Sequence, residues 1–512
     1  MKFRQIFVVT VGAFLSLQAH AQYAEAPQRQ DSTIVFTLDD ALKLALSENV
    51  SVKVADMEIK RQEYAKKGSY GALFPQINAS GSFQRTIKKQ VMYMGGSSGS
   101  SGGGMASMMA SAFEPITYYI QEFAKRHPDV APYVPKETTE TESSGNDGFE
   151  VGRSYTYNVG INAQLPLINA QLWQSLGLSG DQVELSVEKA RESRLGMVTS
   201  VKQAYYAVLM AKAAHAVYQA SYDNALENFK QTERRYNVHK ASELDLTRAQ
   251  SSLASAIPNL FNAENAVGIS LWQLKAVMGL DLEQDIDVAG KLEDFAETMF
   301  RDVNEGANAD LKNNSSIRQL ALQAEMLSKQ IRMQQFAYIP SLSLAFAYSY
   351  NAMAEDLQFK DYHWTPYSYV GLSLNIPIFS GFQRYHTIKQ TRVQLDELDL
   401  QRLNAERQLK IAIRQSLSTM DTQMKTYDAA KEALTSAEKA YDIASKSYEV
   451  GKTTLTDLSN TELLLTQTRL QTSQAVYNFL LAKAQLEQTL GHDFLDEEGN
   501  VKIERTDYEN KK

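Results

Sequence analysis

The 512-residue sequence contains no cysteine, which excludes disulfides, thiolate metal sites, a cysteine nucleophile and a lipid anchor on an N-terminal cysteine. It also lacks net positive charge. The formal charge of -8 argues against a nucleic-acid partner, because such proteins normally carry a basic surface. Tryptophan is scarce, with 3 residues against 26 tyrosines and 20 phenylalanines, and such amphipathic aromatics suit interfaces between apolar and wet surroundings.

No apolar run is long enough for a transmembrane helix, which needs roughly 20 residues. The apolar stretch at 6–17 follows Lys2 and Arg4 and precedes Ala19-His20-Ala21, which is the order of a secretory signal peptide. We therefore expect residues 1–21 to be a signal peptide. Strands of a membrane β-barrel are short and only alternately apolar, so the sequence remains compatible with a barrel.

Motifs of catalysis are missing as well. The 7 histidines are scattered, and there is no Gly-rich phosphate loop after a strand, no His-Glu-x-x-His and no nucleophile elbow. Methionines flank the Gly/Ser-rich run Gly95–Gly104, but methionines in a loop are usually filler. We expect no enzymatic activity, no metal site and no cofactor.

The sequence consists of two related halves. Tyr157–Leu167 reads YNVGINAQLPL, and Ser368–Ile378 reads SYVGLSLNIPI. Matching positions of the two halves are 211 or 212 residues apart: Pro166 and Pro377, Tyr236 and Tyr448, Asp245 and Asp457, Gly279 and Gly491. Because the offset persists over more than a hundred residues (roughly half of a repeat), it indicates an internal duplication.

The duplication predicts the domain boundaries. They are residues 22–280 for the first repeat, 281–314 for an equatorial linker, 315–491 for the second repeat and 492–512 for an equatorial tail. In the first repeat we expect strands at about 76–86 and 154–167, a long extracellular loop at about 87–153 and a turn between helices at about 236–246. In the second we expect strands at about 341–350 and 367–378 and a turn at about 448–458.

All four strands are apolar on one face and mainly polar or small on the other. In the second strand of each repeat the apolar face includes Val159, Ile161, Leu372 and Leu374. This pattern is typical of barrel strands with lipid outside and water inside, so we expect these four side chains to face lipid. The alternative is a soluble sandwich with one face in its core.

The helical stretches have coiled-coil spacing. Apolar residues from Ala204 to Tyr236 and from Leu417 to Tyr448 recur at a mean step near 3.5, which predicts helices packed side by side. Four strands cannot close a barrel, and an open sheet edge cannot lie in lipid. Several chains must therefore share one barrel. Two chains would give a filled eight-stranded barrel and three a twelve-stranded barrel with a lumen.

The chain resembles the TolC-like outer-membrane efflux proteins over nearly all of its mature length. The motifs that carry the resemblance are TLDDALKLAL at Thr37–Leu46, ALFPQI at Ala72–Ile77, LNIPIFSG at Leu374–Gly381 and YEVGKTTLTDL at Tyr448–Leu458. The resemblance implies an α+β membrane protein in the outer membrane, built as a homotrimer. Its twelve-stranded β-barrel would continue as a periplasmic α-helical barrel. The channel would be passive, served by a periplasmic adaptor (membrane fusion protein) and an inner-membrane transporter, which we expect to be of the RND class.

The resemblance also implies a gate at the periplasmic turns. It would be formed by Asp457, Asp245, Tyr448, Lys452 and Asn460. The best-known members of the family carry two aspartates three residues apart near the second turn, whereas here the second position is Asn460. A basic latch residue of the family falls on Thr453, next to Lys452. We further expect Asp245 to bond Tyr448 or Lys452 across neighbouring helices.

The two aspartates also have a purely structural interpretation. Asp245 lies three residues after Ser242, and Asp457 lies three residues after Thr454. This is the spacing of a capping box that begins a helix, and it is compatible with a gate role. In the first turn His239 stands where the second has Gly451, and a left-handed position tolerates histidine less well than glycine. We therefore expect the first turn to have a different geometry.

The turns are also expected to bind the adaptor through exposed residues, namely Val238, His239, Leu246, Val450, Gly451 and Leu458. Other functions remain open at this point. One is a type I protein-secretion duct of the same fold, and another is a structural coiled-coil protein of the envelope, which would leave the four strands without a use. A porin carries all its strands in one chain and fits less well.

Overall fold

The computed structural model describes residues 34–92, 122–123, 125–126, 149–296, 299, 311–357 and 362–491. The expected signal peptide at 1–21, the tail at 492–512 and most of the loop at about 87–153 lie outside these residues. The chain divides into two compact units. The helical unit is Met1–Ser69, Trp173–Gln335 and Gly381–Lys512, and the sheet unit is Tyr70–Leu172 and Phe336–Ser380.

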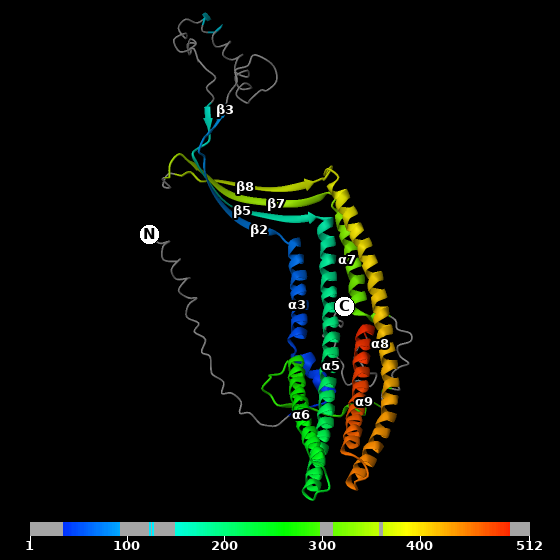
Figure 1. The fold of residues 1–512 in the computed structure, drawn as a ribbon. Coiled ribbons are helices and arrows are strands. Elements are labelled where there is room, and N and C mark those ends of the chain that lie inside the picture. Colours follow the sequence, from blue (N-terminus) through cyan, green and yellow to red (C-terminus); the bar gives the residue numbers. More distant parts are fainter. Residues whose placement is uncertain are drawn as a thin grey trace. The chain divides into compact units, whose positions relative to one another are not determined.

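The sheet unit contains a four-stranded antiparallel sheet in the order β2-β5-β7-β8 (Figure 1). Its strands are β2 (Gln76–Arg85), β5 (Tyr155–Ile168), β7 (Ser341–Ala354) and β8 (Thr365–Asn375). Each repeat contributes one hairpin, and the hairpins meet where β5 pairs with β7. Strands β2 and β8 form the edges. A short second pair, β3 (Gln90–Met92) with β4 (Phe149–Val151), lies between β2 and β5 along the chain, where the long loop begins and ends.

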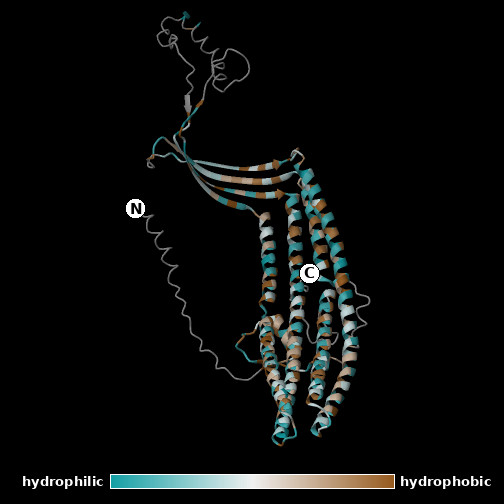
Figure 2. Cartoon of the chain, viewed as in Figure 1, coloured by the Kyte–Doolittle hydropathy of each residue, from teal (hydrophilic) through white to brown (hydrophobic). Residues whose placement is uncertain are grey.

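The register brings the apolar faces of all four strands to one side of the sheet. Ala79 lies opposite Ile161, Ile161 lies opposite Tyr348, and Leu344 lies opposite Leu372. Bands of apolar and polar colour alternate along the strands (Figure 2). A slip of one residue in any pair would have moved one strand's apolar residues to the other face. The alternation predicted from the sequence is thus confirmed across the whole sheet.

The prolines near the ends of β5 and β8 differ in position. Strand β5 continues past Pro166 to Ile168, through a register irregularity between Pro166 and Ile168. A bulge is one of the few places where a strand accommodates a proline, because the residue donates no ladder hydrogen bond. Strand β8 ends at Asn375, before Pro377.

The helical unit repeats its elements almost residue for residue. Helices α5 (Ala170–Asn237) and α8 (Gln383–Glu449) have 68 and 67 residues, and α6 (Glu243–Met278) and α9 (Leu455–Leu490) have 36 each. Helices α3 (Val50–Tyr70) and α7 (Ser315–Phe336) have 21 and 22. The helical unit also contains α2 (Leu38–Glu48) and the short η3 (Leu292–Phe295) and η6 (Leu311–Asn313), and η1 (Gly71–Leu73) lies in the sheet unit. None of the described helices has the length and hydropathy needed to cross a membrane.

The main hydrophobic core lies where the middle of α5 meets the C-terminal ends of α6 and α9. Leu209, Leu274 and Phe479 are fully buried in it. Strand β1 (Ile34–Phe36) pairs in parallel with β6 (Ile286–Val288), and both β6 and η3 pack against this core. The described part of the linker expected at 281–314 therefore packs on the long helices.

The two repeats also end in the same way. Gly279 after α6 and Gly491 after α9 have left-handed φ values of 78° and 64°. Asn49 before α3 donates from Nδ2 to the carbonyl of Val277 at 2.8 Å, and Asn314 before α7 donates to that of Thr489 at 2.7 Å. Asn49 thus joins the start of α3 to the end of α6, and Asn314 joins the start of α7 to the end of α9.

Candidate functional site at the helical turns

The two long helical hairpins end in turns of the same type. In the α5–α6 turn, the N–H groups of His239 and Lys240 donate to the carbonyls of Tyr236 and Arg235 at 2.9 and 2.8 Å. In the α8–α9 turn, those of Gly451 and Lys452 donate to Tyr448 and Ser447 at 3.0 and 2.8 Å. These nested bonds form a Schellman motif, which satisfies the last carbonyls of a helix.

The expectation of a different geometry at His239 is wrong. His239 has φ 58° and Gly451 has φ 78°, so both occupy the left-handed region. Histidine is among the non-glycine residues that enter this region more often than most. The repeated hydrogen bonds therefore hold a histidine in a conformation that glycine adopts without strain.

Both aspartates cap helices, as their spacing predicted. The Ser242 hydroxyl donates to Asp245 Oδ2 at 2.7 Å, and the N–H of Asp245 donates to the Ser242 hydroxyl at 3.1 Å. Thr454 and Asp457 repeat this box at 2.7 and 3.1 Å. Hydrogen bonds from Thr454, and then from Thr453, hold the pKa of Asp457 below its usual value.

Tyr448 has a different partner from the one expected. Its hydroxyl lies 2.7 Å from that of Thr232 on α5, and the Arg235 guanidinium lies 4.8 Å from its ring centroid. Arg235 also donates to the carbonyl of Glu449 at 3.0 Å. Within one chain, the Asp245 carboxylate instead accepts a hydrogen bond from Ser242, the N-cap residue of its own helix. The contacts of Tyr448 with Thr232 and Arg235 could not be predicted from the sequence, because neither partner belongs to a recognisable motif.

The expected docking residues are only partly exposed. Val238 and Val450 are 60% and 68% exposed, and His239 and Gly451 are exposed beside them. Leu458 is 0% exposed, because it packs with Ala249, Tyr448 and Leu455, and Leu246 is half-buried. The prediction that Leu458 is exposed is therefore wrong. Leu244, two residues before Leu246 on α6, is exposed and was not predicted.

Of the remaining expected gate residues, Lys452 lies in the α8–α9 turn and Asn460 lies near the start of α9. Lys452 and Asn460 are both exposed. Arg248 of α6 donates to the hydroxyl of Thr456 on α9 at 3.4 Å, which joins the starts of the two returning helices. The structure thus brings the two turns of one chain into contact through α5 with α8 and through α6 with α9.

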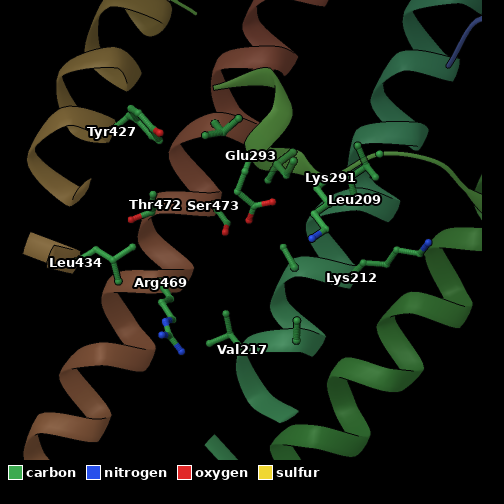
Figure 3. A pocket seen from close by; sticks show the side chains of 15 residues that line it. Leu209, Lys212, Val217, Lys291, Glu293, Tyr427, Leu434, Arg469, Thr472 and Ser473 are labelled. Carbon is green, nitrogen blue, oxygen red and sulfur yellow. The ribbon is translucent and has the colours of Figure 1, made fainter. Parts of the chain in front are cut away.

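A separate cavity of about 620 Å³ lies further along the helices, between α5, α8, α9 and the segment around η3 (Figure 3). Two of the cationic side chains that line it, those of Lys212 and Arg469, are already engaged. Lys212 pairs with Asp287 and donates to the carbonyl of Val288, and Arg469 donates to Glu438 at 3.0 Å. In the described parts of the chain no three His, Asp or Glu side chains gather as a metal site would need. We assign no chemistry to this cavity.

Comparisons with known proteins agree with this architecture. The family model described as "Outer membrane efflux protein" matches residues 128–280 and 307–492. The outer membrane protein TolC of Escherichia coli is 23% identical over an alignment of 365 residues that covers 67% of this chain and 73% of TolC. The protein of the same name from Vibrio cholerae is 20% identical over 68% of this chain and 80% of its own length.

Solved structures show the same fold. The CmeC outer membrane channel of Campylobacter jejuni has a TM-score of 0.61 at 16% identity, over 89% of this chain and 85% of CmeC. The MtrE outer membrane channel of Neisseria gonorrhoeae, solved in its open state, has a TM-score of 0.62 at 16% identity, over 89% of this chain and 88% of MtrE. The chain therefore belongs to the outer membrane efflux protein family, and it is an efflux channel of the outer membrane.

Proposed function

We propose that three copies of the chain form the channel, with twelve strands in one membrane barrel and the long helices in a periplasmic barrel. The channel is passive. A periplasmic adaptor joins it to an inner-membrane transporter of the RND class, which supplies the energy.

The observation that carries this proposal is the sheet with two open edges and one apolar face. The edge strands β2 and β8 have no partner on their outer sides within the described residues. Val159, Ile161, Leu372 and Leu374 are exposed on the apolar face. Unpaired backbone groups are costly in lipid, so further chains must pair with both edges. Pairing β2 of one chain with β8 of the next gives the backbone groups of both edges their hydrogen-bond partners.

The turns support docking of an adaptor. Val238, Leu244 and Val450 expose apolar side chains at the ends of helices that are otherwise capped and packed. Isolated exposed apolar residues are common, but here they cluster at two turns that Arg235 and Tyr448 connect. We propose Val238, His239, Val450 and Gly451 as the docking surface, with Leu246 and Leu458 supporting it from beneath.

Disulfide cross-linking tests the assembly, since the chain has no cysteine of its own. Ser80 of β2 shares a face of the sheet with Gly371 and Ser373 of β8. Within one chain two strands separate them, roughly 14 Å at the usual strand spacing, which is beyond the reach of a disulfide. We therefore expect Ser80→Cys combined with Ser373→Cys or Gly371→Cys to give covalent trimers in membranes.

The matched control is Asn78→Cys with Asn162→Cys, which lie opposite each other in one chain and should leave the mass of the monomer unchanged. In detergent, the uncross-linked protein should have a mass of about three chains of 57.3 kDa, less the signal peptides. A stable monomer with intact strands would contradict the proposal.

A further inference from the structure

Glu462 of α9 is a buried carboxyl that the channel function does not explain. The residue is 7% exposed and faces α5. Its Oε2 lies 3.5 Å from Nδ2 of Asn228, and the hydroxyl of Ser221 also bonds the carboxyl. Its Oε1 has no hydrogen-bond partner in the part of the chain that the structure describes. A buried oxygen without a partner is costly, and more so when the group is charged.

The charged groups around Glu462 do not compensate its charge. Tyr441 of α8 interacts electrostatically with both Glu462 and Arg469 of α9. Arg469 donates to Glu438 at 3.0 Å, so its guanidinium serves another carboxylate. From α5 come the uncharged groups of Ser221 and Asn228. Burial raises the pKa of Glu462 to about 7, while the bond from Ser221 lowers it less.

Glu462 also belongs to a chain of contacts that reaches the turns. The Thr232 hydroxyl donates to the backbone carbonyl of Asn228 at 2.8 Å, and the same hydroxyl bonds that of Tyr448. On α9, Leu458 lies about one helical turn before Glu462 and packs with Tyr448 and Leu455. A change at Glu462 therefore acts on the contact between the repeats directly beside the candidate gate.

We propose that Glu462 is a proton-dependent contact between the two repeats, which holds α9 against α5 while protonated and loosens the packing above the turns when it loses its proton.

The direction of the pH effect follows from the difference between the pKa of Glu462 in the folded chain and in the unfolded chain. The carboxyl is protonated more readily in the folded chain than in the unfolded one, where its pKa is near 4.5. Its contribution to folding is therefore fully present below pH 4.5 and is lost as the pH rises through about 7. Loosening is expected on the alkaline side.

Distance measurements between two spin labels test the proposal. Asp223 of α5 and Gln467 of α9 are exposed residues that flank the contact, and each can be replaced by cysteine and labelled. Labelled chains are diluted with unlabelled ones, so that only distances within a chain are recorded. We expect the distribution to lengthen or broaden between pH 5.5 and 8.5 in the parent (values about 1.5 units either side of the midpoint, so that each form is over nine-tenths populated).

Glu462→Gln keeps the shape of the protonated acid and cannot ionise, so its distribution should stay the same at both pH values. Glu432→Gln removes an exposed carboxylate of α8 and should keep the parent's response. An unchanged parent, or a response in Glu462→Gln equal to the parent's, would overturn the proposal. If the glutamine variant does not fold, the parent decides alone, because its response must have a midpoint near pH 7.

Discussion

The hydroxyl of Tyr448 at the end of α8 lies 2.7 Å from the hydroxyl of Thr232 near the end of α5. Tyr448 is 5% exposed, whereas Tyr236, its counterpart in the first repeat, is 37% exposed. The duplication is therefore broken at this position. One tyrosine of the pair joins the repeats, and the other ends its helix without a comparable contact.

Replacing Tyr448 by phenylalanine should loosen the contact between the turns. The ring can stay beneath Arg235, but the bond to Thr232 is lost, at a cost of about 0.5–1.5 kcal/mol. We expect higher single-channel conductance in a planar bilayer and faster amide exchange at residues 448–452. Tyr236→Phe is the matched control and should behave as the parent. Equal effects of the two variants would show that the hydroxyl of Tyr448 has no special role.

His239→Gly should stabilise the first turn. The residue has φ 58°, and a left-handed conformation costs a non-glycine residue up to about 1–2 kcal/mol. Gly451→Ala should destabilise the second turn by a similar amount, because a Cβ there meets its nearest atom, Arg235 Nη2, at an ordinary 3.4 Å, and the backbone alone carries the cost. Hydrogen exchange at 239–240 and 451–452 measures both. The same sign for both variants would refute this reasoning.

Gly491→Ala should be more harmful than Gly279→Ala, although both glycines have left-handed φ values. A Cβ on Gly491 would lie 2.3 Å from the carbonyl oxygen of Asn313, whereas one on Gly279 would lie 3.2 Å from that of Glu48. We expect Gly491→Ala to cost at least about 1–3 kcal/mol more, the scale for forcing atoms into a packed site. Thermal unfolding of the detergent-solubilised protein provides the comparison, and similar melting temperatures would contradict it.

Arginine on the two faces of the sheet should have unequal effects. At Val159 or Leu372 we expect a cost of about 2–4 kcal/mol if the side chain lies at mid-depth in lipid. Asn162 and Ser373 lie on the opposite face and should accept arginine in the lumen. Denaturant titration of the inserted protein and its abundance in the outer membrane give the two readouts. Equal tolerance on both faces would favour a soluble sheet.

The sequence predicted the elements that depend on periodicity. Alternation located the four strands, and the register confirmed their common apolar face, because a half-buried strand permits only one phase. The capping boxes at Asp245 and Asp457 were also predicted, since a box needs only residues three positions apart. Local spacing is sufficient for both features.

Features that depend on distant residues were not predictable. Leu458 lies next to a turn and was therefore expected to be exposed, yet Tyr448 and Ala249 cover it from other helices. Thr232 and Glu462 look like ordinary polar residues of amphipathic helices, and only the packing of α5 against α8 and α9 gives them partners. Even the turn at His239 was misjudged, because local conformational preference was outweighed by the hydrogen bonds that end α5.

The last prediction separates the two roles of Asp457. Asp457→Ala removes both the charge and the cap, and Asp457→Asn removes the charge while its side-chain oxygen can still accept from Thr454. If three such carboxylates line a narrow opening, they attract cations, so both variants should lower cation selectivity in planar-bilayer recordings. Loss of the cap should lower the stability of the alanine variant by about 1 kcal/mol and should leave that of the asparagine variant unchanged. Asp245→Ala combined with Tyr448→Phe should raise conductance.

The pH dependence of selectivity tests the same point in the parent. In a single chain, bonds from Thr454 keep the pKa of Asp457 below 3.8, so its contribution is present above that value and is lost only as the pH falls through the lowered pKa. In a ring of three, repulsion between like charges opposes joint ionisation and moves the loss to higher pH. A midpoint above 3.8 would therefore indicate a ring at the gate. A lower midpoint, with unchanged selectivity in Asp457→Asn, would leave Asp457 as a helix cap and place the constriction elsewhere.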